Sequence, residues 1–169
     1  MPTTTTPTQE RQERWQEIVS DPLLGELPYK VETNQRGQIV LSPHQFSHSE
    51  LQRTIQKKLD AALPGGEVFP ECPITTEKGV RQADVTWASK DRVSEMKQTG
   101  DPPTLAPKIC VEVMSDSNDW EEMQEKRHLY VEAGAEEVWV VGEGGAVWFW
   151  DSSGQLDSSE IAPDFPNQL

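Results

Sequence analysis

The sequence predicts one α/β domain in which helices pack on a mixed sheet. The chain of 169 residues is long enough for a single domain with a real core. The spacing of the apolar residues predicts, in chain order, a hairpin, a helix, several strands, a second helix and a second hairpin. Residues 107–115 form an apolar, β-branched run that is typical of a strand buried on both faces, so helices should cover the sheet.

The two ends of the chain have the weakest patterns. Residues 1–20 should form an N-terminal tail with one marginal helix over residues 9–19, whose apolar anchors are Trp15, Ile18 and Val19. The domain itself should span residues 21–151. Residues 152–169 are rich in Ser, Asp and Pro, and we expect them to form a peripheral C-terminal tail.

The first part of the domain should contain a hairpin and a helix. Residues 29–33 alternate with a period of two, and a glycine-containing turn connects them to the apolar residues 38–41. Ser47 and Glu50 have the spacing of a capping box. They predict a helix that runs to about Leu63 and ends at a Pro-Gly-Gly sequence.

The middle of the chain should supply further strands. Short strands are expected near residues 67–69 and 72–75, and a longer one over residues 80–88. Residues 89–106 are polar and contain glycine and proline, so they predict a loop. Loops of this length in compact domains tend to be functional or mobile.

The last part of the domain should contain the central strand, a helix and a second hairpin. The strand covers residues 108–114, and the helix covers residues 118–133 and ends at Gly134. Residues 138–141 and 146–150 flank a glycine-rich turn and predict the hairpin.

The charge of the chain is strongly negative and unevenly placed. The formal net charge is −14, and residues 115–169 contain 2 basic and 13 acidic residues. The chain therefore lacks the uniformly basic surface of a protein that binds nucleic acid tightly, and any DNA binding should have low affinity. A local basic cleft or bound metal ions would still be compatible with this charge.

The two cysteines, Cys72 and Cys110, do not form a disulfide framework or a zinc-binding pattern. They are expected to be reduced thiols of a cytoplasmic protein. No segment approaches the roughly 18 apolar residues of a membrane helix, so we expect no membrane contact.

Two carboxylates lie within strand-like apolar runs. Glu112 is near the end of the central strand, and Asp84 lies in residues 83–87. A buried carboxylate is costly unless it is paired, hydrogen-bonded or bound to a metal. Taken alone, Asp84 has a simpler interpretation as a strand-end residue, and Glu112 as the partner of a lysine.

That lysine is Lys126. It follows Met123 by three residues and precedes Leu129 and Tyr130 by three and four, so it lies in the apolar stripe that faces the sheet. There it needs an anionic partner, unless its side chain extends past the helix edge to solvent. Two buried acids repel each other and need a cation between them, so the three residues together indicate a metal-dependent phosphodiesterase site.

Other candidates have simpler explanations. Glu71 is a plausible third acid, but it also fits an ordinary residue at a sheet edge. Glu50 is explained by its capping box. His44 and His48 have the spacing of a metal-binding pair, but no third ligand lies nearby, so zinc is not expected.

These residues resemble a known family. In order and spacing, residues 38–150 are similar to the Uma-two family of restriction endonucleases, in the PD-(D/E)XK nuclease superfamily. The matching pieces are Glu71–Thr75, Val80, Ala83–Ser89, Ile109–Ser115, Lys126 with Leu129 and Tyr130, and Gly134–Val140.

The resemblance implies a restriction-endonuclease-like fold. It implies Asp84 and Glu112 as metal ligands, Lys126 as the site lysine and Glu71 as an accessory acid. The chain departs from the pattern at Met114, because the superfamily lysine normally occupies that position, two residues after the second acid. The resemblance thus implies that the lysine has moved to the helix. A second departure is Ala83, where the family often has proline.

The predicted function is a Mg²⁺-dependent endonuclease that hydrolyses DNA, with Mn²⁺ as a substitute for Mg²⁺. A basic group on the first long helix is placed to contact DNA phosphates, although a solvated helix face explains it more simply; its members are Arg53, Lys57 and Lys58. The alternatives are an inactive scaffold with the nuclease fold, and a module that binds a basic protein partner. A homodimer would suit cleavage of two strands, but no sequence feature indicates one.

Overall fold

The computed structural model describes residues 4–115 and 118–169, so the first three residues of the expected N-terminal tail lie outside it. The helices of this part are α1 (Pro7–Val19), α2 (Pro22–Gly25), α3 (Phe46–Ala62), α4 (Lys90–Gln98) and α5 (Trp120–Glu132). The strands are β1 (Tyr29–Thr33), β2 (Ile39–Pro43), β3 (Gly66–Thr76), β4 (Gly79–Ser89), β5 (Ile109–Val113), β6 (Glu137–Val141), β7 (Val147–Asp151) and β8 (Gly154–Leu156).

The main sheet has six strands in the order β3-β4-β5-β6-β7-β8. Only the pairing of β5 with β6 is parallel, and the other neighbours are antiparallel. Every residue of β5 and β6 is buried, as expected for strands covered on both faces. The predicted mixed sheet flanked by helices is therefore confirmed.

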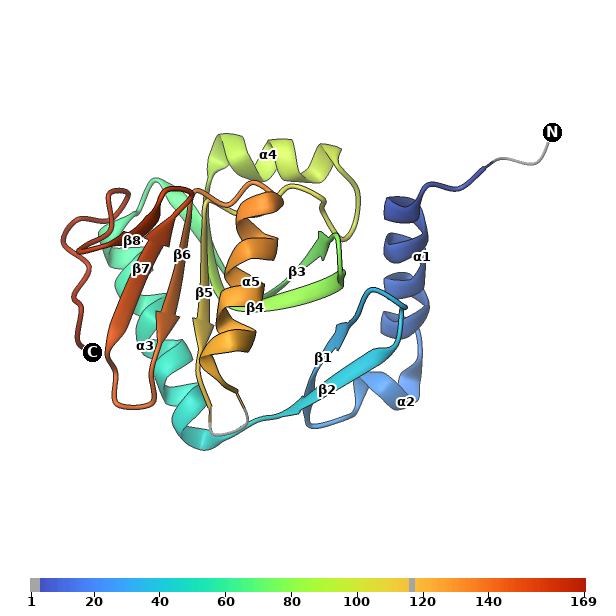
Figure 1. Cartoon of the computed structure of the whole chain (residues 1–169), viewed down its shortest axis with the longest axis horizontal. Coiled ribbons are helices and arrows are strands. Elements are labelled where there is room, and N and C mark those ends of the chain that lie inside the picture. The colour runs from blue at the N-terminus through green and yellow to red at the C-terminus, as the bar shows by residue number, and fades with distance from the viewer. Residues whose placement is uncertain (1–3, 116–117) are drawn as a thin grey trace.

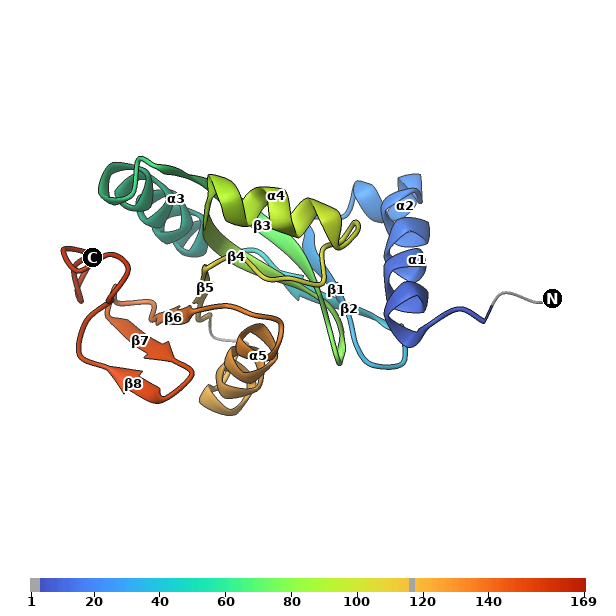
Figure 2. The same ribbon diagram turned by 90° about the horizontal axis from the view of Figure 1, so that it is seen from above.

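Helices α3 and α5 lie on opposite faces of this sheet (Figure 2). Side chains alternate along β5, so Val111 packs in one core with Ile55 and Leu59 of α3. Cys110 points the other way and packs with Tyr130 of α5. Glu112 shares the direction of Cys110 and must therefore be accommodated beneath α5.

Strands β1 and β2 form a separate two-stranded sheet, as predicted for a hairpin. With α1 and α2 they lie at one side of the molecule, far from β7 and β8 (Figure 1). The expected marginal helix docks there, because Trp15 and Ile18 are buried against Val80 of β4. Strand β1 contacts β4, which brings hairpin side chains close to the main sheet.

Two local predictions are wrong. The proposed capping box at Ser47 and Glu50 is not formed: α3 begins at Phe46, and its N-cap, Gln45, makes no side-chain hydrogen bond. The expected loop 89–106 contains α4, because Ser89 caps this helix and Met96 is buried against the sheet.

Two further expectations need correction. The short strands near residues 67–69 and 72–75 are one strand, β3, in which Glu71 has a φ of 49° and interrupts the pairing. Residues 152–169 are more than a peripheral tail, because they supply β8 and two core side chains, Ala162 and Phe165.

A buried acid fastens this C-terminal segment to the sheet. The side chain of Glu137 in β6 accepts hydrogen bonds from the Ser159 hydroxyl at 2.7 Å and from the Glu160 N–H at 2.8 Å. The composition of residues 152–169 does not indicate that this polar segment binds a buried acid of the sheet.

None of the helices in the described part of the chain has the length and hydrophobicity needed to cross a bilayer. Cys72 and Cys110 are buried free thiols, and burial raises the pKa of Cys72 to about 11.

Candidate active site

The two predicted metal ligands meet where β4 and β5 diverge. The strands pair only between Val85–Trp87 and Ile109–Val111, and Asp84 and Glu112 are the next residues beyond this paired segment. Their exposed fractions are 1% and 2%. Neighbouring antiparallel strands thus place two acids side by side on the face covered by α5.

One oxygen of each acid is held by a fixed donor. The backbone N–H of Val113 donates to Asp84 Oδ2 at 2.8 Å. The hydroxyl of Tyr130 donates to Glu112 Oε1 at 2.6 Å. Asp84 Oδ1 and Glu112 Oε2 are the oxygens that face the lysines of the site.

Lys126 lies where the helical pattern predicts. It is buried in the same stripe of α5 as Met123 and Leu129, and only 3% of it is exposed. Its Nζ is 3.5 Å from Glu112 Oε2 and 3.2 Å from Glu32 Oε1. The alternative, a side chain that extends to solvent, is excluded by this burial.

Sequence analysis missed two site residues on β1. Lys30 Nζ is 3.0 Å from Asp84 Oδ1 and 3.1 Å from Glu112 Oε2, so one ammonium group bridges both acids. Glu32 pairs with Lys126 and also accepts the Gln82 N–H at 2.8 Å. The sequence feature that could have indicated them is weak: Lys30 and Glu32 are two residues apart in a predicted strand and therefore share one face.

His48 is a third missed residue. It lies in the first turn of α3, and its Nε2 is 3.4 Å from Asp84 Oδ2. The hydrogen bond to Asp84 raises the pKa of His48 against the effect of burial. Within the described residues, its buried Nδ1 has no hydrogen-bond partner. The sequence suggested His48 only as part of a zinc pair with His44, and the structure instead joins it to an acid.

Glu71 is not brought into this cluster. It is exposed on β3 and lines a neighbouring cavity of about 330 Å³, together with Lys30 and His44. Within the described residues, no hydrogen bond or ion pair joins Glu71 to Asp84 or Glu112. Its role as an accessory acid would have to be exercised from this second cavity.

The two central acids have different electrostatic environments. Burial raises the pKa of Glu112 to about 7, although Lys126 and Lys30 act in the opposite direction. Burial would also raise the pKa of Asp84, but Lys30 and His48 hold it well below its usual range. Without a metal ion, these surroundings favour the ionised form of Asp84 and the protonated form of Glu112.

The donor set fits a magnesium ion better than a metal held by protein ligands alone. The acids border a cavity of about 20 Å³, which has room for about one water molecule, so a hydrated ion needs more space than the side chains leave in this arrangement. Among residues 4–115 and 118–169, no three His, Cys, Asp or Glu side chains are grouped to enclose a metal. Mg²⁺ usually keeps several waters and binds through one or two carboxylates, which Asp84 and Glu112 can supply.

Comparison with known proteins identifies the family of the chain. The model of the Uma2 family, described as "Putative restriction endonuclease", matches residues 9–166. The chain belongs to the Uma2 family. This membership supports a nuclease function and confirms the resemblance to the Uma-two family.

A solved structure shares the fold of this Uma2 protein. It is a "putative nuclease belonging to DUF820" from Anabaena variabilis ATCC 29413, with a TM-score of 0.65 and 14% sequence identity. The match covers 82% of this chain and 86% of the other. A DrdV–DNA complex matches more weakly, with a TM-score of 0.44 and 8% identity over 91% of this chain and 12% of that chain. No curated protein sequence matches the chain.

Proposed function

We propose that this Uma2 protein is a Mg²⁺-dependent endonuclease that hydrolyses phosphodiester bonds of DNA, with Mn²⁺ as a substitute ion. The observation that carries the proposal is the meeting of two buried acids, Asp84 and Glu112, where two strands diverge beside two buried lysines. Family membership supports the same reaction class.

Asp84 and Glu112 would hold the metal ion. When bound, Mg²⁺ would supply Lewis-acid chemistry to the phosphate and lower the pKa of water. The Val113 N–H and the Tyr130 hydroxyl fix the orientation of the two carboxylates. Fixed ligands of this kind reduce the reorganisation needed at the moment of reaction.

Lys126 would act on the phosphate or on the attacking water. Its ammonium is held between Glu32 and Glu112 in a buried position, where a charge interacts more strongly than it would in solvent. In that position it can offset the negative charge that develops on the phosphate or orient the water.

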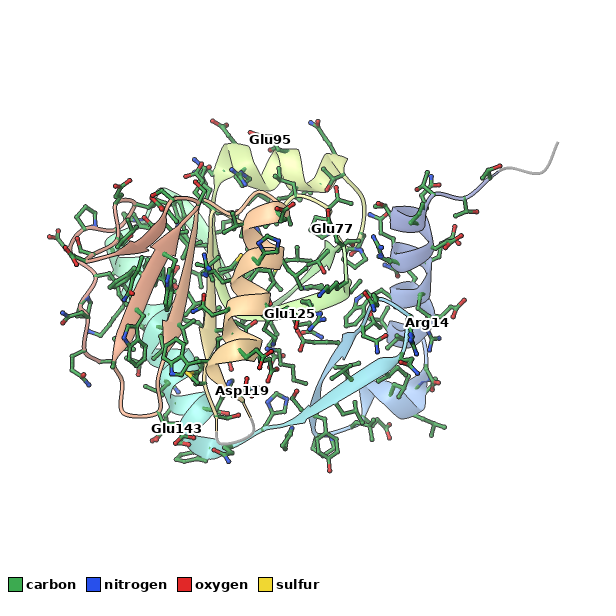
Figure 3. All side chains as sticks on the ribbon, in the orientation of Figure 1. Arg14, Glu77, Glu95, Asp119, Glu125 and Glu143 are labelled. Carbon is green, nitrogen blue, oxygen red and sulfur yellow. The ribbon has the colours of Figure 1, made fainter. Side chains whose placement is uncertain are left out.

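DNA would be bound weakly and mainly through its phosphates. Arg53, Lys57 and Lys58 are exposed on α3, the helix whose Gln52 hydrogen-bonds the Asp84 carbonyl. The net charge of −14 opposes binding elsewhere. Acidic side chains are distributed over distant parts of the surface, for example Glu95 on α4 and Glu143 between β6 and β7 (Figure 3). A homodimer remains a prediction.

A plasmid-nicking assay tests the proposal. Wild-type protein with Mn²⁺ or Mg²⁺ should convert supercoiled plasmid to nicked or linear forms, and chelation should stop the reaction. Asp84→Ala and Glu112→Ala should abolish it. The matched control is Glu143→Ala, which removes an exposed acid from a turn and should leave cleavage unchanged.

One observation favours a second candidate, an inactive scaffold with the nuclease fold. Lys30 already bridges Asp84 and Glu112, so a permanent ion pair would satisfy both acids without a metal. If several DNA forms and metals give no cleavage above the Glu112→Ala background, the scaffold replaces the endonuclease as the proposed function.

A further inference from the structure

Lys30 lies between Asp84 and Glu112, the two acids that would hold the metal ion. We infer that its ammonium group occupies the cation position between Asp84 and Glu112, and that Mg²⁺ or Mn²⁺ binds there only when Lys30 withdraws. The inference rests on the proposed metal site. It makes Lys30 a positioning residue that lowers the metal affinity of the resting protein.

The hydrogen bonds of the acids leave few free oxygens. Asp84 Oδ2 already accepts the Val113 N–H and contacts His48, and Glu112 Oε1 accepts the Tyr130 hydroxyl. An ion held by Asp84 and Glu112 would therefore need the remaining oxygens, Asp84 Oδ1 and Glu112 Oε2, to be accessible. These are the two oxygens that Lys30 Nζ contacts, at 3.0 and 3.1 Å. The ion and the ammonium compete for the same atoms.

The charges of the cluster lead to the same conclusion. When ionised, its three carboxylates carry one more charge than its two ammonium groups, which belong to Lys30 and Lys126. A divalent ion added to this buried group would leave excess positive charge, which is costly away from solvent. If Lys30 withdraws as the ion binds, the three carboxylates, Lys126 and the ion balance while His48 beside Asp84 is neutral, and protonation of His48 would add a further positive charge.

The structure offers Lys30 another place. Its side chain lines both the small cavity at the acids and the neighbouring cavity of about 330 Å³ that contains Glu71. A lysine side chain has a flexible four-carbon stem, so we infer that the ammonium group of Lys30 moves into this neighbouring cavity when the ion binds. Glu71, for which no ion pair is found in the described residues, would then become its partner. This gives the predicted accessory acid a role outside the metal site.

Calorimetric titration with Mn²⁺ tests the inference. The variant Lys30→Met should bind Mn²⁺ at least about ten-fold more tightly than the wild type, because a site blocked most of the time loses affinity in proportion to its free fraction. Lys78→Met is the matched control: it removes the same charge from an exposed side chain and should leave affinity unchanged. Glu71→Gln should weaken binding.

Thermal unfolding provides a readout that does not depend on cleavage. In chelator, Lys30→Met should melt below the wild type, because two buried acids lose a counter-charge. With saturating Mn²⁺, this difference should disappear or reverse. If Lys30→Met does not fold, Lys30→Gln retains hydrogen bonding to the acids without the charge and replaces it in both measurements.

Each outcome decides the inference. Equal or weaker Mn²⁺ binding by the Lys30 variant, with a metal-binding wild type, overturns it and leaves the proposed nuclease intact. Binding by the variant and none by the wild type supports it and argues against a nuclease in the resting protein. An absence of binding by both overturns the inference and the metal site together.

Discussion

Single residues determine how the two acids of the site differ. Asp84 lies beside an ammonium group, an imidazole and a backbone N–H, all of which favour its ionised form. Glu112 shares Lys126 with Glu32 and Lys30 with Asp84, and burial is the largest influence on its pKa. The surroundings of these neighbouring carboxylates thus shift their pKa values in opposite directions.

Replacement of Lys126 should lower both stability and cleavage, and a second substitution should restore only stability. Lys126→Met leaves Glu32 and Glu112 buried without this partner, so we expect a loss of about 3–5 kcal/mol in the free energy of unfolding. Adding Glu32→Gln should restore part of that stability. Cleavage should fall by about 10²–10³ in both variants, because the positioned charge is absent.

Urea unfolding and nicking rates, measured on the same preparations, check this prediction. Full activity of Lys126→Met would assign the lysine function elsewhere, with Lys30 the next candidate.

The raised pKa of Glu112 predicts a pH dependence of the metal-free protein. An unfolded glutamate has a pKa of about 4.3, whereas Glu112 has one of about 7 in the folded chain. The folded state therefore binds more protons between these values, and stability should decrease as pH rises from about 4.5 to 7, by roughly 3 kcal/mol. The raised pKa of His48 acts in the same direction near neutral pH.

Unfolding in chelator at several pH values measures this slope. Glu112→Gln should flatten it, and an unchanged slope in that variant would show that other groups are responsible.

At the scale of elements, sequence patterns predicted the strands and helices whose side chains have a regular apolar period. β5, α5 and the hairpin of β6 and β7 are found where they were expected. Tertiary contacts decided the rest: α4 depends on Met96 and its cap, and the C-terminal segment depends on Glu137.

The residues of the site likewise include some that sequence patterns predicted and some that only the folded structure shows. Asp84, Glu112 and Lys126 could be identified because a charge within an apolar pattern is unusual. Lys30 and His48 could not, because charged residues are ordinary in a half-exposed hairpin or at the start of a helix. Only the folded hairpin shows that β1 crosses to the acids.

Helix α3 provides a prediction about DNA. If it contacts phosphates, replacing Arg53, Lys57 and Lys58 together by alanine should lower DNA affinity about ten-fold or more and reduce its salt dependence. Mn²⁺ affinity should not change.

Fluorescence anisotropy at several salt concentrations tests this. The control replaces Lys90 and Lys97 on α4, which are also exposed. If both sets of substitutions have the same effect, α3 is an ordinary solvated face.

The whole molecule combines a rigid sheet with an acidic surface. Residues 115–169 carry most of the excess negative charge, yet the site in their vicinity contains two buried lysines. A protein with this charge distribution should depend on bound cations, and little on general attraction, to approach DNA. The central claim is therefore that the acid pair is a metal site.

Metal-dependent stabilisation tests that claim most directly. The wild type and the double variant Asp84→Asn/Glu112→Gln should be melted with increasing Mn²⁺ and Mg²⁺, with binding followed by calorimetry and folding by circular dichroism. At a hundred-fold excess over Kd, we predict that the wild-type Tm rises by about 5–10 °C and that the double variant does not respond. An equal response in the two proteins, or none in the wild type, would contradict the account.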